Sequence, residues 1–293
     1  MAVRRRLGVP PARARVRPGG ARAGTGGAVL AAAVLAGACA TGCSGGADAE
    51  DARAATDPVQ ALRQAPDVLL QAGSAQTRTS MEMATGGTRV TIRGEGGYDF
   101  RGQRGQLTLV LPQNPTGAAE HVPLTELLAP GALYMKNRGA GVPPDKWVRV
   151  DTATLVDGNL VTGGATDPFA AAEVLRGTRT ATYVDRTEVA GVPVRHYRGT
   201  ADLALAAKSA TAADEAALTA AAKGFATASV PFDAYLDDQG RIRKLRQRFA
   251  FVNGQLGSTV AVFSTTLLYA FGTPVTVTLP RPQDIYTGRI AES

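Results

Sequence analysis

The chain has 293 residues, with 32 Lys and Arg against 25 Asp and Glu, so its formal net charge is +7. Seven arginines precede Cys43 with no acidic residue among them, which leaves the remainder neutral overall. This distribution and a low aromatic content argue against a general nucleic-acid binder. Two cysteines, both near the start, exclude a disulfide scaffold.

Residues 1–42 are predicted to be a lipoprotein signal peptide. A basic stretch is followed by a short uncharged run over residues 28–40, which is rich in Ala, Val and Leu. That run is shorter than the roughly 20 residues that a membrane-spanning helix needs. It ends in small residues before a cysteine, and this resembles a bacterial lipobox.

Cys43 is the predicted lipidation site, because Thr41-Gly42 precede it and small residues follow it. Cys39 is the alternative, and so is ordinary signal cleavage that leaves Cys43 unmodified. Two or more acyl chains hold a protein stably at a membrane, so we expect an extracytoplasmic protein anchored to the outer face of the cell membrane. Export through the general secretory or the twin-arginine route stays open.

Residues 43–56 are small, polar or charged and predict a flexible tether. A helix is expected next, because Asp57 supplies an N-cap and Pro58 a first-turn proline, and Pro66 is expected to kink or divide it. Alternating apolar residues then predict half-buried antiparallel strands. These residues are Met81, Met83, Val90, Ile92, Leu107, Leu109, Leu111, Leu133 and Met135.

The second half of the chain is also predicted to combine short helices with antiparallel strands. A short helix is predicted over residues 167–176, and strands on both sides of the turn at residues 190–193. The Ala-rich stretch 202–228 predicts one long helix that ends near Gly224. A hairpin is expected next, with strands 230–236 and 242–251 joined by the turn at 237–240. Strands at 260–269 and 274–279 are predicted to close the sheet. Without a βαβ rhythm, the pattern favours one α+β domain over residues 57–293.

Motifs for catalysis, metals and nucleotides are missing from the sequence. The body has two histidines, His121 and His196, and neither a zinc pattern nor a phosphate-binding loop. His196 is better explained as a hydrogen-bonded sheet residue than as an acid or base. We therefore expect no cofactor, no metal and no enzymatic activity.

One basic tract stands out near the predicted hairpin. It has five positive charges without an acid, and it could contact anionic lipid headgroups. A solvated outer face of the sheet is the alternative. The residues are Arg241, Arg243, Lys244, Arg246 and Arg248.

Short motifs in a fixed order connect the chain to a family. They are Leu133-Tyr134-Met135-Lys136, Lys146-Trp147-Val148, Gly191-Val192-Pro193-Val194-Arg195-His196-Tyr197, and Ala234-Tyr235-Leu236-Asp237 with Gly240-Arg241. Together they resemble actinobacterial envelope lipoproteins of the LppX/LprA/LprF/LprG type, whose fold is similar to the lipoprotein carriers LolA and LolB. The resemblance covers most of the chain after residue 57.

This resemblance implies a curved antiparallel half-barrel with helices on its concave side and an apolar cavity between them. Known members bind acylated lipids or glycolipids there and help to move them across the envelope. We therefore expect a lipid or glycolipid ligand, with no nucleic acid as a partner and with any protein partner undefined. The candidate cavity residues are Met81, Met83, Val90, Ile92, Leu107, Leu109, Leu133, Met135, Phe232 and Leu236. A non-carrier lipoprotein that acts as a protein-binding or regulatory module is the alternative.

Overall fold

A computed structural model describes residues 57–85, 88–110, 123–139, 141–161, 165–252 and 259–288. The predicted signal peptide (1–42) and tether (43–56), and with them Cys43, lie outside these residues. So do His121 and Leu111.

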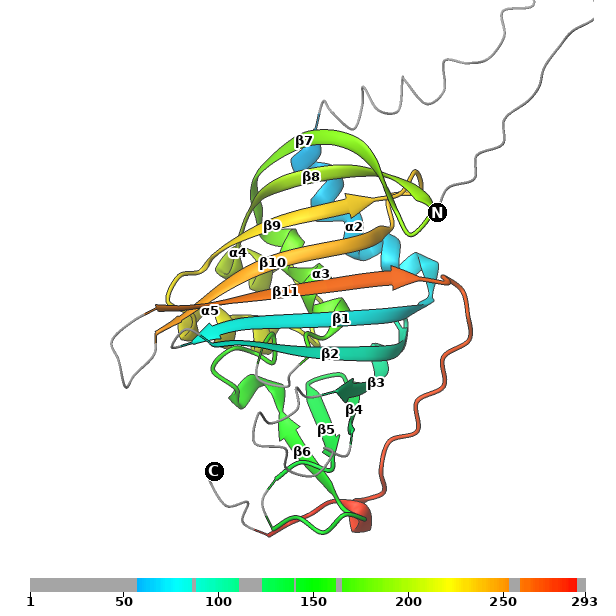
Figure 1. Ribbon diagram of the computed structural model, residues 1–293, viewed down its shortest axis with the longest axis vertical. Helices are drawn as coiled ribbons and strands as arrows, with labels where there is room; N and C mark the ends of the chain where they lie inside the picture. The colour runs from blue at the N-terminus through cyan, green and yellow to red at the C-terminus, as the bar shows by residue number, and fades with distance from the viewer. Residues whose placement is uncertain are drawn as a thin grey trace, which may run out of the picture. The chain divides into compact units, whose positions relative to one another are not determined.

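Eleven antiparallel strands form one open sheet in the order β6-β5-β4-β3-β2-β1-β11-β10-β9-β8-β7 (Figure 1). The strands are β1 Ser74–Thr85, β2 Thr88–Asp99, β3 Arg104–Val110, β4 Leu124–Ala129, β5 Ala132–Lys136, β6 Trp147–Asp151, β7 Thr178–Val189, β8 Val192–Asp202, β9 Ser229–Leu236, β10 Ile242–Val252 and β11 Thr259–Tyr269. The helices are α2 Pro58–Ala72, α3 Pro168–Glu173, α4 Leu203–Ser209 and α5 Glu215–Gly224, with short 3₁₀ turns η1 Thr152–Thr154, η2 Val174–Gly177 and η3 Pro282–Asp284.

Figure 1 shows the four α-helices behind one face of the curved sheet. The contacts between elements agree, since α2 contacts β7 and β1, α3 contacts β10, and α4 contacts β8. The predicted α+β class, a curved antiparallel half-barrel with helices on its concave side, is confirmed.

Helix α2 begins where the sequence predicts. The Asp57 carboxylate accepts a hydrogen bond from the Gln60 backbone N–H at 2.9 Å, and Pro58 occupies the first turn. The helix ends at Gly73, whose φ of 84° suits glycine. Pro66 is buried within the helix and does not divide it.

The predicted long helix over residues 202–228 is wrong, because the structure has two helices there. Asp202 caps α4 by accepting from the Leu205 N–H. After α4, the Thr211 N–H donates to the buried Glu173 carboxylate at 2.7 Å instead of continuing a helical ladder. The chain then turns and α5 begins at Glu215. A contact between residues far apart in sequence has overridden the helix propensity of the alanines.

The strand predicted over residues 274–279 is also wrong. β11 is already paired on both sides, with β1 and β10, so no ladder position remains beside it. The segment runs on instead to the β6 edge of the sheet. There the Tyr286 N–H donates to the Trp147 carbonyl at 2.8 Å, which ties the end of the described chain to that edge.

The core lies between the concave face and the helices. An aromatic cluster occupies its centre, where Phe169 of α3 packs against Tyr98 and Phe100 at ring distances of 6.5 and 6.1 Å. Leu62 and Leu69 of α2 are fully buried in the same core. The helices therefore fill this part of the concave face with side chains.

Candidate functional site

The ten candidate cavity residues share one face of the sheet. Residues directly opposite each other in an antiparallel ladder point to the same side. Met81 pairs with Ile92 and with Ser264, and the ladders carry this face across the sheet in both directions. The alternation read from the sequence thus identifies the concave face.

A cavity of about 590 Å³ lies along this face, bounded by β1, β2, β4, β10 and β11. The volume is within the roughly 300–1,000 Å³ that is usual for small-molecule sites. Most of its lining is apolar, with Asn137 and Arg138 as the polar exceptions. The lining residues are Met83, Ile92, Leu124, Asn137, Arg138, Gly139, Val161, Phe251, Val260 and Val262.

Of the ten candidates, Met83 and Ile92 line this cavity. Val90 lies opposite Met83 on β2 and is half-buried. The other seven are buried in the core and are not among the lining residues of this cavity. They are Met81, Leu107, Leu109, Leu133, Met135, Phe232 and Leu236. A role in ligand binding stays a prediction for all ten.

Several lining residues were not predicted. Phe251, Val260 and Val262 lie on strands that the sequence does indicate, and their alternation on β10 and β11 could have placed them on the concave face. Val161 and residues 137–139 lie outside the strands, and no periodic signal marks them.

Glu126 is an unusual polar residue on the same face. It lies two residues along β4 from the cavity residue Leu124, and it pairs with Leu107 and Met135. Its side chain is 0% exposed, and neither carboxylate oxygen has a hydrogen-bond partner. Burial raises the pKa of this carboxyl to about 8, although the Arg138 charge opposes the rise. Glu126 is therefore neutral at pH 7.

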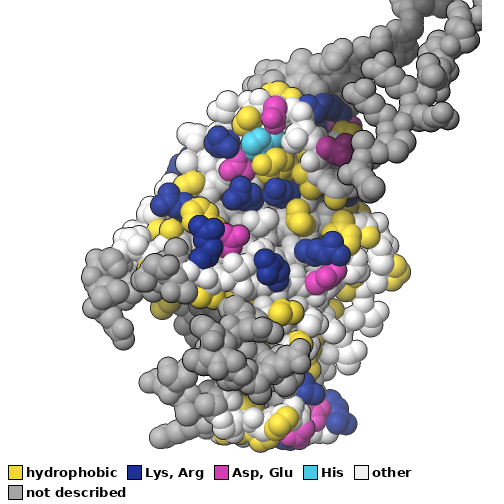
Figure 2. Space-filling model, viewed as in Figure 1, with side chains coloured by type: hydrophobic (Ala, Val, Ile, Leu, Met, Phe, Trp, Pro, Cys, Tyr) yellow, Lys and Arg dark blue, Asp and Glu magenta, His cyan; other side chains and the backbone are white. Residues whose placement is uncertain are grey.

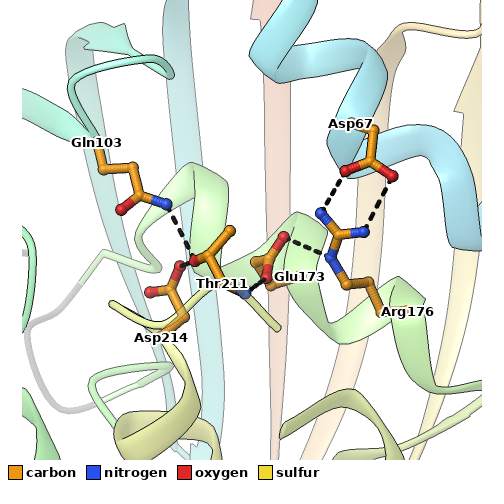
Figure 3. Close-up of polar contacts among 6 residues, drawn as sticks. All are labelled: Asp67, Gln103, Glu173, Arg176, Thr211 and Asp214. Atoms are coloured by element: carbon orange, nitrogen blue, oxygen red, sulfur yellow. Dashed lines mark hydrogen bonds and ion pairs between the residues drawn. The ribbon is translucent and has the colours of Figure 1, made fainter. Parts of the chain in front are cut away.

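A polar network holds the helices together behind the sheet (Figure 3). The Arg176 guanidinium donates to the buried Glu173 at 2.8 Å and to Asp67 of α2 at 2.7 Å. Glu173 also accepts from the Thr211 N–H, and the Thr211 hydroxyl donates to Asp214 at 3.0 Å. These bonds tie α2, η2 and the α4–α5 connection to one another. Each member contacts another in the set, so the network has a structural function.

His196 also lies in a hydrogen-bonded sheet environment. Its Nε2 lies 2.7 Å from Asp233 and its Nδ1 3.3 Å from Asp185, and its ring stacks on Tyr235 at 4.3 Å. Arg198 donates to the same Asp233 oxygen at 3.0 Å. These contacts give His196 a structural position on the surface of the sheet. Among the residues that the structure describes, no cluster of three or more His, Cys, Asp or Glu is placed to hold a metal ion.

The basic tract separates into two groups. Arg241 and Arg243 lie at the hairpin end, where both guanidinium groups stack on Phe271 and Arg241 pairs with Asp237 at 2.9 Å. Lys244, Arg246 and Arg248 alternate along β10, with Lys244 over the Tyr235 ring and Arg248 over the Phe263 ring. Figure 2 shows Lys and Arg side chains spread over the convex face, with acidic side chains among them.

No helix in the described part of the chain is long and apolar enough to span a membrane. No protein-family model matches the chain, and no characterised protein sequence is detectably similar to it.

Comparison with solved structures gives matches to lipoproteins. The chain is similar to the Mycobacterium tuberculosis lipoprotein LppX, with 10% identity and a TM-score of 0.44 over 76% of this chain and all of that one. It is also similar to LprF from Mycobacterium bovis, with 14% identity and a TM-score of 0.39 over 77% and 97% of the two chains. A putative outer membrane lipoprotein-sorting domain from Vibrio parahaemolyticus matches at 8% identity and a TM-score of 0.29, over 73% and 95%. LppX and LprF are of the type that the sequence motifs resemble.

Proposed function

We propose that this protein is an envelope lipoprotein that binds an acyl chain of a lipid or lipidated molecule in the apolar cavity and aids its transport. The observation that carries this proposal is the cavity of about 590 Å³ among apolar side chains of β1, β2, β10 and β11. Each methylene group transferred from water to such a site contributes about 0.8 kcal/mol. Asn137 and Arg138 line the same cavity and offer polar contacts to a headgroup.

The proposal includes an anchor at the membrane. Cys43 would carry the acyl groups, and residues 44–56 would link it to the domain that begins at Asp57. Fully extended, a tether of this length reaches on the order of 40 Å. The cavity could thus take up its ligand close to the outer face of the cytoplasmic membrane. Lipid transfer of this kind needs no acid, base or metal.

The test is lipid extraction and mass spectrometry on purified protein. Wild type and a Cys43→Ala form are compared, because a lipid found in both forms cannot be the anchor. Ile92→Trp places an indole in the cavity, so we expect its lipid content to fall at least about tenfold.

Thr91→Trp is the matched control, since it carries the same substitution one residue earlier on β2, where the side chain points to the other face. It should keep its lipid. Equal lipid content in both variants, with intact circular dichroism, would refute binding in this cavity. A wild-type protein without lipid would favour the alternative, a protein-binding or regulatory module.

A further inference from the structure

We propose a second binding site on the convex face of the sheet, where Arg198, Arg246 and Arg248 bind the headgroup phosphate of an anionic phospholipid at a bilayer surface. Figure 2 views this face directly. The site is separate from the concave cavity, so the proposal stands without the proposed function.

The ladders place the three arginines close together on one face of the sheet. Arg198 of β8 lies opposite Asp233 of β9, and Asp233 lies opposite Arg246 of β10. Two residues further along β10, Arg248 lies opposite Phe263 of β11. Residues opposite each other point to one side of a sheet, so these five side chains form a single patch. We call this patch the arginine groove.

The groove is hollow because β9 and β10 separate. Their pairing ends at Phe232 and Gln247, although β10 continues to Val252. Pro231, the next residue toward the start of β9, has no N–H with which to continue a ladder. The gap forms a hollow of about 240 Å³ that all five groove residues line. A second hollow of about 260 Å³ adjoins it, shares Arg246 and Phe263, and adds Glu82, Met83 and Arg89.

The charges in the groove are unequally paired. Asp233 already accepts from His196 and from Arg198. The exposed Arg246 has neither a hydrogen-bond nor an ion-pair partner among the described residues. Arg248 lies over the Phe263 ring, with its guanidinium carbon 5.8 Å from the ring centroid. Three guanidinium groups thus face one carboxylate around the first hollow. An anion there would relieve the repulsion between them.

Glu82 limits where the anion can lie. It sits opposite Phe263 on β1 and lines the second hollow, not the first. A phosphate would therefore occupy the first hollow, away from this carboxylate. Guanidinium groups suit a phosphate because their planar N–H pairs match its oxygens.

Phe263 favours a lipid headgroup over a soluble phosphate. Phe263 is 42% exposed and lies at the edge of the patch, with Arg248 beside it on β10 and Glu82 on β1. An exposed apolar ring beside an arginine gains nothing from a dissolved anion. It does fit the boundary between headgroups and acyl chains, while the arginines contact the phosphates. Arginines next to an exposed apolar side chain thus indicate a bilayer surface.

The experiment measures binding of the full chain carrying Cys43→Ala to vesicles of phosphatidylglycerol and phosphatidylcholine, and to vesicles of phosphatidylcholine alone. On this background, Arg246→Glu with Arg248→Glu should weaken binding to the anionic vesicles about tenfold or more. Arg104→Glu with Arg149→Glu changes the net charge equally, at exposed positions on β3 and β6. This control should bind nearly as well as the parent.

Two further measurements separate a bilayer from a dissolved anion. Phe263→Ser should weaken vesicle binding severalfold, and inorganic phosphate alone should show no binding by calorimetry at millimolar concentration. Equal losses in the groove variant and in its control would overturn the proposal, because net charge would then explain them. Tight binding of free phosphate that Phe263→Ser leaves unchanged would also overturn it. Thermal melts establish that each variant is folded.

Discussion

The two ends of the concave face differ in what lies against them. At one end, α2, α3 and α4 cover the strands, and side chains such as Phe169, Leu69 and Leu203 are fully buried. At the other end, Met83, Ile92 and Phe251 are half-buried and border a cavity of about 590 Å³. We call these the packed end and the hollow end.

The difference shows that strand composition does not decide whether a sheet face is filled. Both ends present alternating apolar residues, and the same strands β1, β10 and β11 run through both. The opposing layer makes the difference, since helices supply large side chains at the packed end. At the hollow end, Val161 and residues 137–139 complete the lining of the cavity. A sheet of one chemical character can therefore provide both a filled core and a cavity.

The largest expected contrast comes from truncating one side chain at each end. Phe169→Ala should lower the free energy of unfolding by roughly 3–5 kcal/mol, because it leaves a void beside Tyr98 and Phe100 in a closed core. Ile92→Ala should cost about 1 kcal/mol, because its side chain already borders a cavity. Urea unfolding of the two variants measures both values. Similar losses would mean that the hollow end is as tightly packed as the core.

The sequence predicts local features better than features that depend on distant contacts. The Asp57 cap and the hairpin turn are confirmed, because Asp57 bonds to Gln60 and Asp237 accepts from the backbone N–H groups of Gln239 and Arg241. The break in the Ala-rich helix escaped prediction, because it depends on Glu173, which is 38 residues from Thr211.

In the candidate site, too, local features could be predicted and features that depend on distant contacts could not. Alternation on the strands is a local pattern, and it identifies the concave face. The position of the cavity along that face depends on where the helices pack, which no strand pattern contains. Met83 and Ile92 could therefore be proposed from sequence together with core residues such as Leu107, but not separated from them.

A smaller effect is expected from pH, through Glu126 beside the hollow end. Burial raises its pKa from 4.5 to about 8, so the folded protein keeps a proton that the unfolded chain has lost. The free energy of unfolding should therefore fall as pH rises from about 4.5 to about 8. At about 1.4 kcal/mol for each pH unit, Glu126 alone should account for about 3 kcal/mol between pH 5 and pH 8.

Glu126→Gln should remove the share of this dependence that comes from Glu126, about 3 kcal/mol between pH 5 and pH 8, because the amide does not titrate. A slope of comparable size should remain below about pH 7, since burial also raises the pKa of Asp167 to about 6 and that of Asp214 to about 7. Glu82→Gln, on the convex face of β1, retains Glu126 and should keep the full slope. Chemical denaturation at several pH values measures these differences. An unchanged slope in Glu126→Gln would mean that the carboxyl is ionised in the folded protein.

The smallest contrast compares one substitution at two buried threonines. The Thr79 hydroxyl has no hydrogen-bond partner and lies on the concave face, on the same β1 face as Met83. The Thr178 hydroxyl, at the packed end, donates to the Leu175 carbonyl at 2.6 Å. Valine has nearly the same shape as threonine but no hydroxyl. Thr79→Val should therefore raise the free energy of unfolding by about 1 kcal/mol, and Thr178→Val should lower it by about the same amount.

Measurements with and without bound lipid extend this last comparison to function. A Thr79→Val variant that is more stable than wild type but holds less lipid would show that the hydroxyl contacts the ligand. A variant that is more stable and holds its full lipid content would place Thr79 outside the ligand's reach, with the cavity ending at Met83 and Ile92. A loss of stability on Thr79→Val would contradict the absence of a partner for this hydroxyl. Thr79 would then resemble Thr178, whose hydroxyl has a hydrogen-bond partner.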